Sequence, residues 1–384
     1  MIIFDAHLDL AWNAIDFNRD LRLSVAEIRR SEDGMAGKSR GCNTVSFPEL
    51  RSGKVVIFIA TLLARLLRAG PNPAVQRYTS MQAAYGAACG QLAYYRAMEQ
   101  EGWLRRIKDS ATLESHIRAW EGEAPAEPFA RTGSAGASPS RRSVIGPSNP
   151  ENSKEPLGFI LSMEGADPIL HPDQVHEWYT AGLRIVGPAH YGVSPYVHGT
   201  DTEGGLFSPG PALLKVMEEV GMILDVTHLA DQSFDEALDI FGGPVLASHH
   251  NCRALVPHQR QLTDEQIKRL ISRGAVIGSA FDAWMLYPGW IRGQTTPEQS
   301  GVKIETVVHH IDRVCQIAGN ARHAAIGSDL DGGFGREQSP LDLDTIADLQ
   351  RLPDLLRSRG YDQEAIEGIM HANWIRFFRE AWKK

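Results

Sequence analysis

Several histidines and acids in this chain stand directly after short apolar runs, at spacings that suit a divalent metal ion. His7 and Asp9 are two residues apart. Side chains alternate along an extended segment, so these two project to the same side and can hold one cation. Glu164 follows the apolar run that ends at Met163. Its carboxylate either caps the next loop or offers two oxygens that bridge two metal ions.

Two further apolar runs end in histidine. His228 follows the run 222–227, and the pair His249-His250 follows the run 245–248. A single histidine at such a place is more typical of a structural residue, but two of them beside the His-x-Asp pair and the glutamate favour metal ligands. Only one residue of the pair His249-His250 can point to the same site. The residues alone leave open which one does.

Two acids and one arginine complete the candidate site. Asp329 and Asp331 lie between Gly327 and Gly332, which allow tight turns near a ligand. Each acid could be a proton shuttle, a metal ligand or a loop former. Arg253 follows the histidine pair, and its planar guanidinium suits bidentate binding of a carboxylate, with an exposed salt bridge as the alternative.

A fold that gathers strand ends must position these residues. Eight apolar runs predict buried parallel strands, with helical patterns between them: Ile2–His7, Val55–Leu62, Leu157–Met163, Leu183–Ala189, Met222–Thr227, Val245–Ser248, Ala275–Phe281 and His323–Gly327. Eight strands with helical crossovers favour an α/β fold of the (β/α)8 TIM barrel type, in which active sites lie at the carboxyl ends of the strands. We expect one domain over 1–384, with a flexible Ala/Gly/Ser/Pro-rich insertion at about 121–156 and additional helices at about 342–384.

Composition narrows the class of protein. The 384 residues include 39 Lys+Arg and 47 Asp+Glu, a formal net charge of −8, which disfavours nucleic acid as a partner. No run approaches the roughly 18 apolar residues of a membrane span, and no signal-peptide pattern opens the sequence. The four cysteines are scattered and are expected to be free thiols. We therefore expect a cytoplasmic protein that binds no membrane.

Five blocks of the sequence resemble the membrane dipeptidase (renal dipeptidase) family of zinc-dependent dipeptidases, metallopeptidase family M19. The blocks occur in the family's order and are Phe4–Asp9, Ser162–Ala166, Asp225–His228, Ser248–Leu255 and Ile326–Gly332. Two features depart from the family pattern. His250 stands where a small polar residue is expected, and the insertion at 121–156 is not a family feature.

The resemblance implies a binuclear site with two Zn²⁺ ions per chain. His7 and Asp9 would hold one zinc, His228 and His249 the other, and Glu164 would bridge them. His190, at the end of Gly187-Pro188-Ala189-His190, matches the family's substrate-contacting histidine. The resemblance further implies that Arg253 binds the substrate carboxylate, that Asp329 binds the substrate amino group and transfers a proton, and that the protein forms a homodimer.

The function we expect is hydrolysis of dipeptides that carry a free C-terminal carboxylate. Two cations can share a water, lower its pKa and present hydroxide to the scissile carbonyl. His190 would stabilise the oxyanion, and Asp329 would carry the proton to the leaving amine. One alternative is another metal-dependent amidohydrolase on the same barrel, such as an N-acyl-amino-acid deacylase. A second is a metal-binding barrel without catalytic activity.

Overall fold

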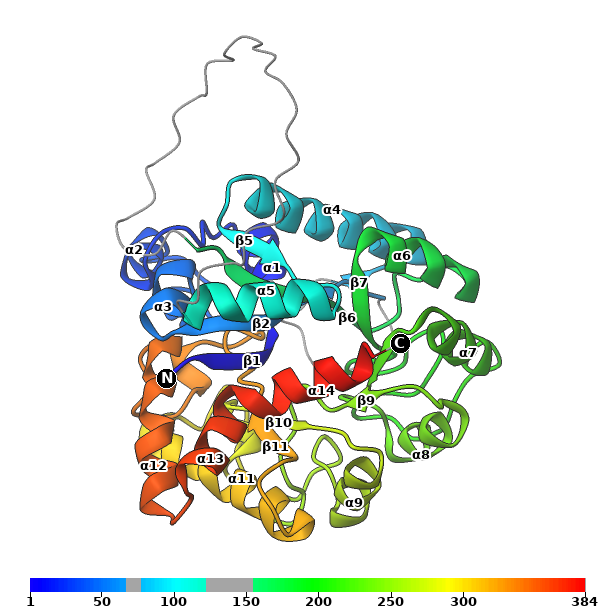
Figure 1. Ribbon diagram of the computed structural model, residues 1–384. Coiled ribbons are helices and arrows are strands. Elements are labelled where there is room, and N and C mark those ends of the chain that lie inside the picture. Colours follow the sequence, from blue (N-terminus) through cyan, green and yellow to red (C-terminus); the bar gives the residue numbers. More distant parts are fainter. Residues whose placement is uncertain (67–76, 122–154, 384) are drawn as a thin grey trace, which may run out of the picture.

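The chain folds around a barrel of eight parallel strands. The computed structural model describes residues 1–66, 77–121 and 155–383, so most of the predicted insertion at 121–156 lies outside the described residues. Around the barrel the strands follow the order β10-β11-β1-β2-β6-β7-β8-β9. A parallel bridge between Ala247 and Ile277 joins β9 to β10 and closes the ring. The predicted (β/α)8 architecture is confirmed (Figure 1).

All eight predicted strands occur. The barrel strands are β1 (Ile3–Leu8), β2 (Val55–Leu63), β6 (Leu157–Glu164), β7 (Leu183–Gly187), β8 (Ile223–Asp225), β9 (Val245–Leu246), β10 (Ile277–Ser279) and β11 (Ala324–Ile326). Short strands outside the ring are β3 (Arg65–Leu66), β4 (Arg77–Tyr78) and β5 (Leu104–Arg106). Every residue of β2 and of β6 is buried, as continuous apolar runs covered on both faces should be.

Helices surround this ring (Figure 1). They are α1 (Leu10–Asp16), α2 (Val25–Ser31), α3 (Phe47–Ser52), α4 (Met81–Gln100), α5 (Ser110–Glu121), α6 (Val175–Ala181), α7 (Gly210–Val220), α8 (Asp231–Ile240), α9 (Asp264–Ser272), α10 (Pro297–Ser300), α11 (Ile304–Ala318), α12 (Leu352–Ser358), α13 (Gln363–Glu367) and α14 (Asn373–Ala381). In α9, Thr263 and Gln266 form the N-terminal capping box, and Gly274 follows in the left-handed region at φ 71°. None of the helices in the described ranges is long and apolar enough to cross a membrane.

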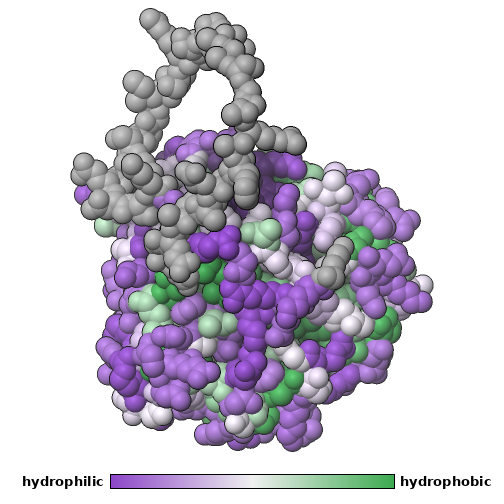
Figure 2. Space-filling view, in the orientation of Figure 1, coloured by the Kyte–Doolittle hydropathy of each residue, from purple (hydrophilic) through white to green (hydrophobic). Residues whose placement is uncertain are grey.

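The last helix covers the amino-terminal end of the barrel. Figure 1 shows α14 in red across the strands, with the N-terminus of β1 beside it. The rings of Phe4 and Phe378 stack with centroids 5.5 Å apart, and the Trp374 indole donates to the Ile326 carbonyl at 2.9 Å. Figure 2 shows mostly hydrophilic residues on this side, with small separate apolar patches. Because this end is filled with aromatic side chains, a polar site must lie at the opposite, carboxyl end.

Candidate metal centre

Seven of the eight predicted site residues meet at the carboxyl ends of the strands. His7 lies near the end of β1, Asp9 just beyond it, and Glu164 is the last residue of β6. The other four each stand three residues beyond the end of a strand: His190 after β7, His228 after β8, His249 after β9 and Asp329 after β11. The side chain of Asp329 is 14% exposed, and the remaining six residues are at most 8% exposed.

Glu164 lies at the centre of the cluster. Its Oε1 is 3.2 Å from His228 Nε2 and 3.3 Å from His249 Nε2, while its Oε2 is 3.6 Å from His7 Nε2. His7 Nε2 is also 3.6 Å from Asp9 Oδ2. With metal–ligand bonds of about 2.0–2.2 Å, two ligands of one tetrahedral ion lie roughly 3.4 Å apart. The two glutamate oxygens therefore face two separate groups of ligand atoms at metal-binding spacing.

Several of these atoms lack a hydrogen-bond partner among the described residues. They include His7 Nε2, Asp9 Oδ1 and Glu164 Oε1, all of them buried. Buried polar atoms are nearly always satisfied, and leaving one unpaired is costly. Three sets of ligand atoms converge within 4.8 Å: His7-Asp9-Glu164, His7-His249-Asp329 and Glu164-His190-His228. The donor set and its unpaired atoms fit divalent cations.

Neighbouring hydroxyls orient the two histidines of the second group. Thr200 Oγ1 lies 3.0 Å from His228 Nδ1, and Ser248 Oγ lies 2.9 Å from His249 Nδ1. Ser248 donates its own hydroxyl proton to Asp225 Oδ2 at 2.5 Å. Thr200 donates its hydroxyl proton to the His228 carbonyl at 3.3 Å. Each hydroxyl is therefore left to accept from a ring Nδ1–H, which fixes the tautomer and leaves the Nε2 lone pair of both rings facing Glu164.

Two buried aspartates tie adjacent strand ends together. Asp5 Oδ1 accepts the backbone N–H groups of His7 and Ser328, at 3.2 and 2.8 Å, and so joins β1 to the end of β11. Asp225 Oδ1 in the same way accepts the N–H groups of Thr227 and Ser248, at 3.0 and 3.1 Å, and joins β8 to β9. Each aspartate holds the backbone beside a candidate ligand.

The two acids of the loop after β11 have different roles. Asp329 has φ 59°, in the left-handed region, and its Oδ1 lies 3.8 Å from His7 Nε2. Asp331 points away from the cluster, and its carboxylate accepts the backbone N–H groups of Thr44 and Val45, at 2.7 and 3.0 Å. Of the alternatives that the sequence left open, the geometry makes Asp331 the loop former and leaves Asp329 at the site.

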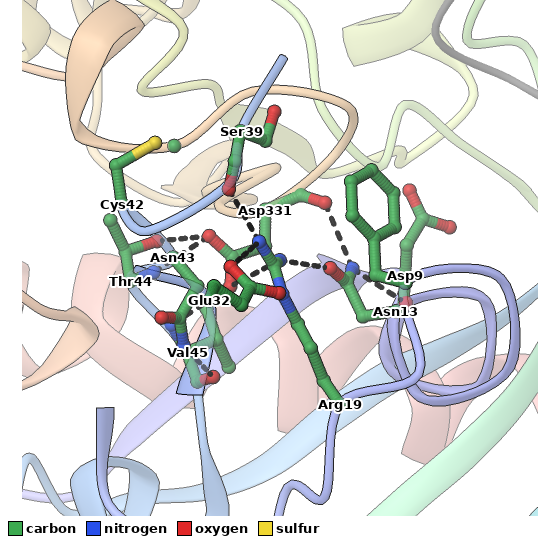
Figure 3. Close-up of polar contacts among 12 residues, drawn as sticks. Asp9, Asn13, Arg19, Glu32, Ser39, Cys42, Asn43, Thr44, Val45 and Asp331 are labelled. Atoms are coloured by element: carbon green, nitrogen blue, oxygen red, sulfur yellow. Dashed lines mark hydrogen bonds and ion pairs between the residues drawn. The ribbon is translucent and has the colours of Figure 1, made fainter. Parts of the chain in front are cut away.

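A buried polar network connects these loops to Asp9 (Figure 3). The Asn13 amide donates to the carbonyl oxygens of Asp9 and Asp331, at 3.0 and 2.9 Å. Arg19 donates to Asn13 Oδ1 at 2.6 Å and forms an ion pair with Glu32 at 2.8 Å. Asn13 therefore fixes the backbone of a candidate ligand relative to the loop that carries Asp329.

The charges of the cluster also favour cations. Burial opposes protonation of His7, but the carboxylates of Glu164 and Asp9 outweigh it and raise its pKa to about 10. Burial raises the pKa of Glu164 to about 7. Burial and neighbouring positive charges lower the pKa of His228 and His249 well below its usual range. The site thus combines the neutral imidazoles of His228 and His249 with buried acids that need positive charge beside them.

Comparison with known proteins decides the family. The sequence model of the membrane dipeptidase family, peptidase family M19, matches residues 149–383. The chain belongs to this family. The matched range contains Glu164, His228, His249 and Asp329, whereas His7 precedes it and is linked to the others by the structure.

Several relatives match part of the chain of this membrane dipeptidase family member. An uncharacterized protein in the pqqA 5′ region of Klebsiella pneumoniae is 33% identical over 237 residues, which are 59% of this chain and 83% of that protein. Dipeptidase tcpJ of Claviceps purpurea is 30% identical over 210 residues, 53% of this chain and 46% of that protein. The aligned part of the chain spans about half the length of the curated dipeptidases that it matches.

Solved structures share the fold over the whole chain. A metallo peptidase from Rhodobacter sphaeroides, liganded with a phosphinate mimic of the dipeptide L-Ala-D-Ala, has a TM-score of 0.71 at 20% identity and covers 100% of this chain and 99% of that one. The probable dipeptidase PvdM from Pseudomonas aeruginosa has a TM-score of 0.70 at 15% identity, with coverage of 100% and 96%.

The structure of this family member does not bring Arg253 to the centre. Its guanidinium forms a bidentate ion pair with Asp231, at 2.7 and 2.9 Å, and donates to the carbonyl oxygens of Gln259 and Gln261. A different arginine, Arg260, lines the cavity that contains the cluster. The position of Arg260 in the sequence gave no signal of this, because Arg260 stands eleven residues beyond the candidate ligand His249.

The same contacts distinguish His249 from His250. Only the His249 ring faces Glu164 and His228. The His250 ring turns away, and its Nδ1 lies 3.2 Å from Arg260 Nη1. Arg260 also donates to the His249 carbonyl at 2.8 Å. His250, which stands where a small polar residue is expected, therefore lies against Arg260.

Proposed function

We propose that this protein is a zinc-dependent dipeptidase with a binuclear metal site that cleaves dipeptides with a free C-terminal carboxylate. The single observation that carries the proposal is the position of Glu164, whose two oxygens face two separate groups of buried ligands. Membership of the membrane dipeptidase family supports the peptide substrate.

The residues divide into two metal positions that share Glu164. His7 and Asp9 would hold one cation, and His228 and His249 would hold the other. When bound, such a pair of cations supplies Lewis acidity, which polarises a carbonyl and lowers the pKa of a water. The mixture of imidazole and carboxylate ligands suits zinc.

The remaining groups of the cavity suit the two ends of a dipeptide. Asp329 would bind the substrate amino group, and its Oδ1 would accept a proton from the attacking water and return it to the leaving amine nitrogen. Burial raises the pKa of Asp329, which favours a carboxylate that takes up and releases a proton. His190, whose pKa is lowered by burial, would donate a hydrogen bond to the carbonyl oxygen as a neutral imidazole.

We assign the substrate carboxylate to Arg260 rather than to Arg253. Arg260 lines the cavity and is anchored to His249, beside the second metal position. Arg253 lies outside the cavity with its donors engaged by Asp231. A fixed guanidinium beside the scissile bond would limit the enzyme to short peptides whose carboxylate lies within its reach.

The test is purified protein reconstituted with zinc and offered free dipeptides and N-acetylated amino acids. We expect two zinc ions per chain by elemental analysis, and release of free amino acids from dipeptides alone. Cleavage restricted to N-acetylated amino acids would establish the deacylase alternative. Two bound zinc ions without turnover of any peptide or amide would establish the non-catalytic alternative.

A further inference from the structure

The cavity beside the metal centre contains two cations that the proposed dipeptide chemistry does not use. Three basic side chains line it: Lys38, Arg260 and Arg292. Arg260 is assigned to the substrate carboxylate, and the two ends of a dipeptide require no further cation. Arg292 and Lys38 therefore need a separate explanation.

Aromatic side chains hold Arg292 in place. Its guanidinium carbon lies 4.1 Å from the centroid of the Trp284 ring and 5.0 Å from that of Tyr191, and Nη2 donates to the Tyr191 hydroxyl. Both rings are buried, at 7% exposure each. Stacking on aromatic faces fixes the plane of a guanidinium, so less rotamer entropy is lost when it binds a ligand.

Within residues 1–66, 77–121 and 155–383, neither cation forms an ion pair with a carboxylate. Among the residues that the structure describes, no carboxylate oxygen lies within 4.0 Å of a side-chain nitrogen of Arg292 or Lys38. Asp282 and Asp201 are acids whose charges act on Arg292. Asp282 Oδ1 accepts a hydrogen bond from the Gln338 amide at 2.8 Å and another from the backbone N–H of Trp284 at 3.2 Å.

Asp282, a buried acid, acts on both Lys38 and Arg292 through its charge. A pre-oriented guanidinium with free donors is suited to bidentate binding of a carboxylate.

We propose that Arg292, assisted by Lys38, forms a subsite for a carboxylate side chain, so that the preferred substrates are dipeptides containing Glu or Asp. This inference rests on the proposed dipeptidase function and adds the substrate class. It concerns a side chain of the substrate, whereas Arg260 recognises the carboxylate that every dipeptide carries.

The experiment compares substrates of equal shape and different charge: Glu-Ala with Gln-Ala, and Ala-Glu with Ala-Gln. We expect the zinc-loaded enzyme to show kcat/KM at least tenfold higher for the Glu member of one pair. In Arg292→Met that ratio should fall to about 1, and in Lys38→Met it should fall partway. Arg253→Met is the matched control and should keep the ratio, because Arg253 is ion-paired outside the cavity.

The outcomes separate this inference from the proposed function. Equal rates on both members of each pair in the wild type, or a ratio retained in Arg292→Met, would overturn the acidic subsite and leave the dipeptidase standing. Absence of any dipeptide cleavage would overturn both. Should Arg292→Met fail to fold, Tyr191→Phe, which removes only the hydroxyl that Arg292 contacts, must lower the ratio for the inference to hold.

Discussion

Replacing Asn13 by alanine tests whether the network of Figure 3 positions a metal ligand or only stabilises the fold. The substitution removes the two hydrogen bonds to the Asp9 and Asp331 carbonyls and the one from Arg19. Taking about 1 kcal/mol for each neutral bond and about 2 kcal/mol for the charged one, we expect the metal-free protein to lose about 4 kcal/mol of unfolding free energy. We also expect zinc affinity to fall about tenfold, because the backbone of Asp9 is no longer fixed.

A matched variant separates these two effects. The Asn373 amide also donates to two backbone carbonyls, of Ala321 and Ala324, at 2.7 and 2.9 Å, but at the opposite end of the barrel. Asn373→Ala should cost about 2 kcal/mol by the same arithmetic and leave zinc affinity unchanged. Urea unfolding of the metal-free proteins and zinc titration against a competing chelator measure the two quantities. Unchanged zinc affinity in Asn13→Ala, or an equal loss in both variants, would refute the positioning role.

Three further outcomes are expected. His7→Ala should lower zinc content and activity together, whereas Arg260→Met should keep both zinc ions and raise KM. Elemental analysis and steady-state kinetics distinguish the two variants. Equal zinc loss in both would contradict our division of roles. Burial lowers the pKa of His310 from 6.5 to about 3, so between these pH values the unfolded chain binds a proton that the folded chain does not, and stability falls as pH decreases. At pH 5 the loss of unfolding free energy is about 2 kcal/mol. In metal-free His310→Asn, urea unfolding at a series of pH values should no longer show this loss. An unaltered pH dependence of the unfolding free energy would contradict the prediction. At Gly327 an added Cβ would overlap the Ser248 carbonyl oxygen. Gly327→Ala should therefore lower both the melting temperature and the zinc content. Wild-type values of either quantity would show that the strand ends can separate.

The strands could be predicted because burial on both faces leaves a clear pattern. β2 is nine residues long without a polar interruption except Thr61, and even β9, only two residues long, stands inside an apolar run. Helix α5 carries a weaker signal, since its buried face is a narrow stripe that includes His116. That histidine is buried and its Nε2 lies 2.9 Å from the Val56 carbonyl, so its role is structural.

The convergence of the candidate ligands could be predicted for a related reason. Strand ends in a barrel converge, so residues far apart in sequence are brought together by topology alone. Asp5 and Asp225 carry a further sequence signal. Each is an acid within an otherwise apolar run, and a buried acid there requires hydrogen-bond donors, which the adjacent strand end provides.

The choice between Arg253 and Arg260 depends on a loop whose path no periodicity reveals. Arg253 stands close to His249 in sequence, and that proximity made it the natural candidate. The loop doubles back, however: the Arg253 N–H donates to the Leu262 carbonyl at 2.8 Å, and Cys252 and Leu262 form a bridge pair. The return segment therefore passes the end of β9 and brings Arg260 against the His249 carbonyl, while Arg253 faces Asp231 at the outside. On our assignment of Arg260 to the substrate carboxylate, its recognition depends on where this loop returns. A change of loop length should then move Arg260 from the cavity without disturbing any of the candidate metal ligands.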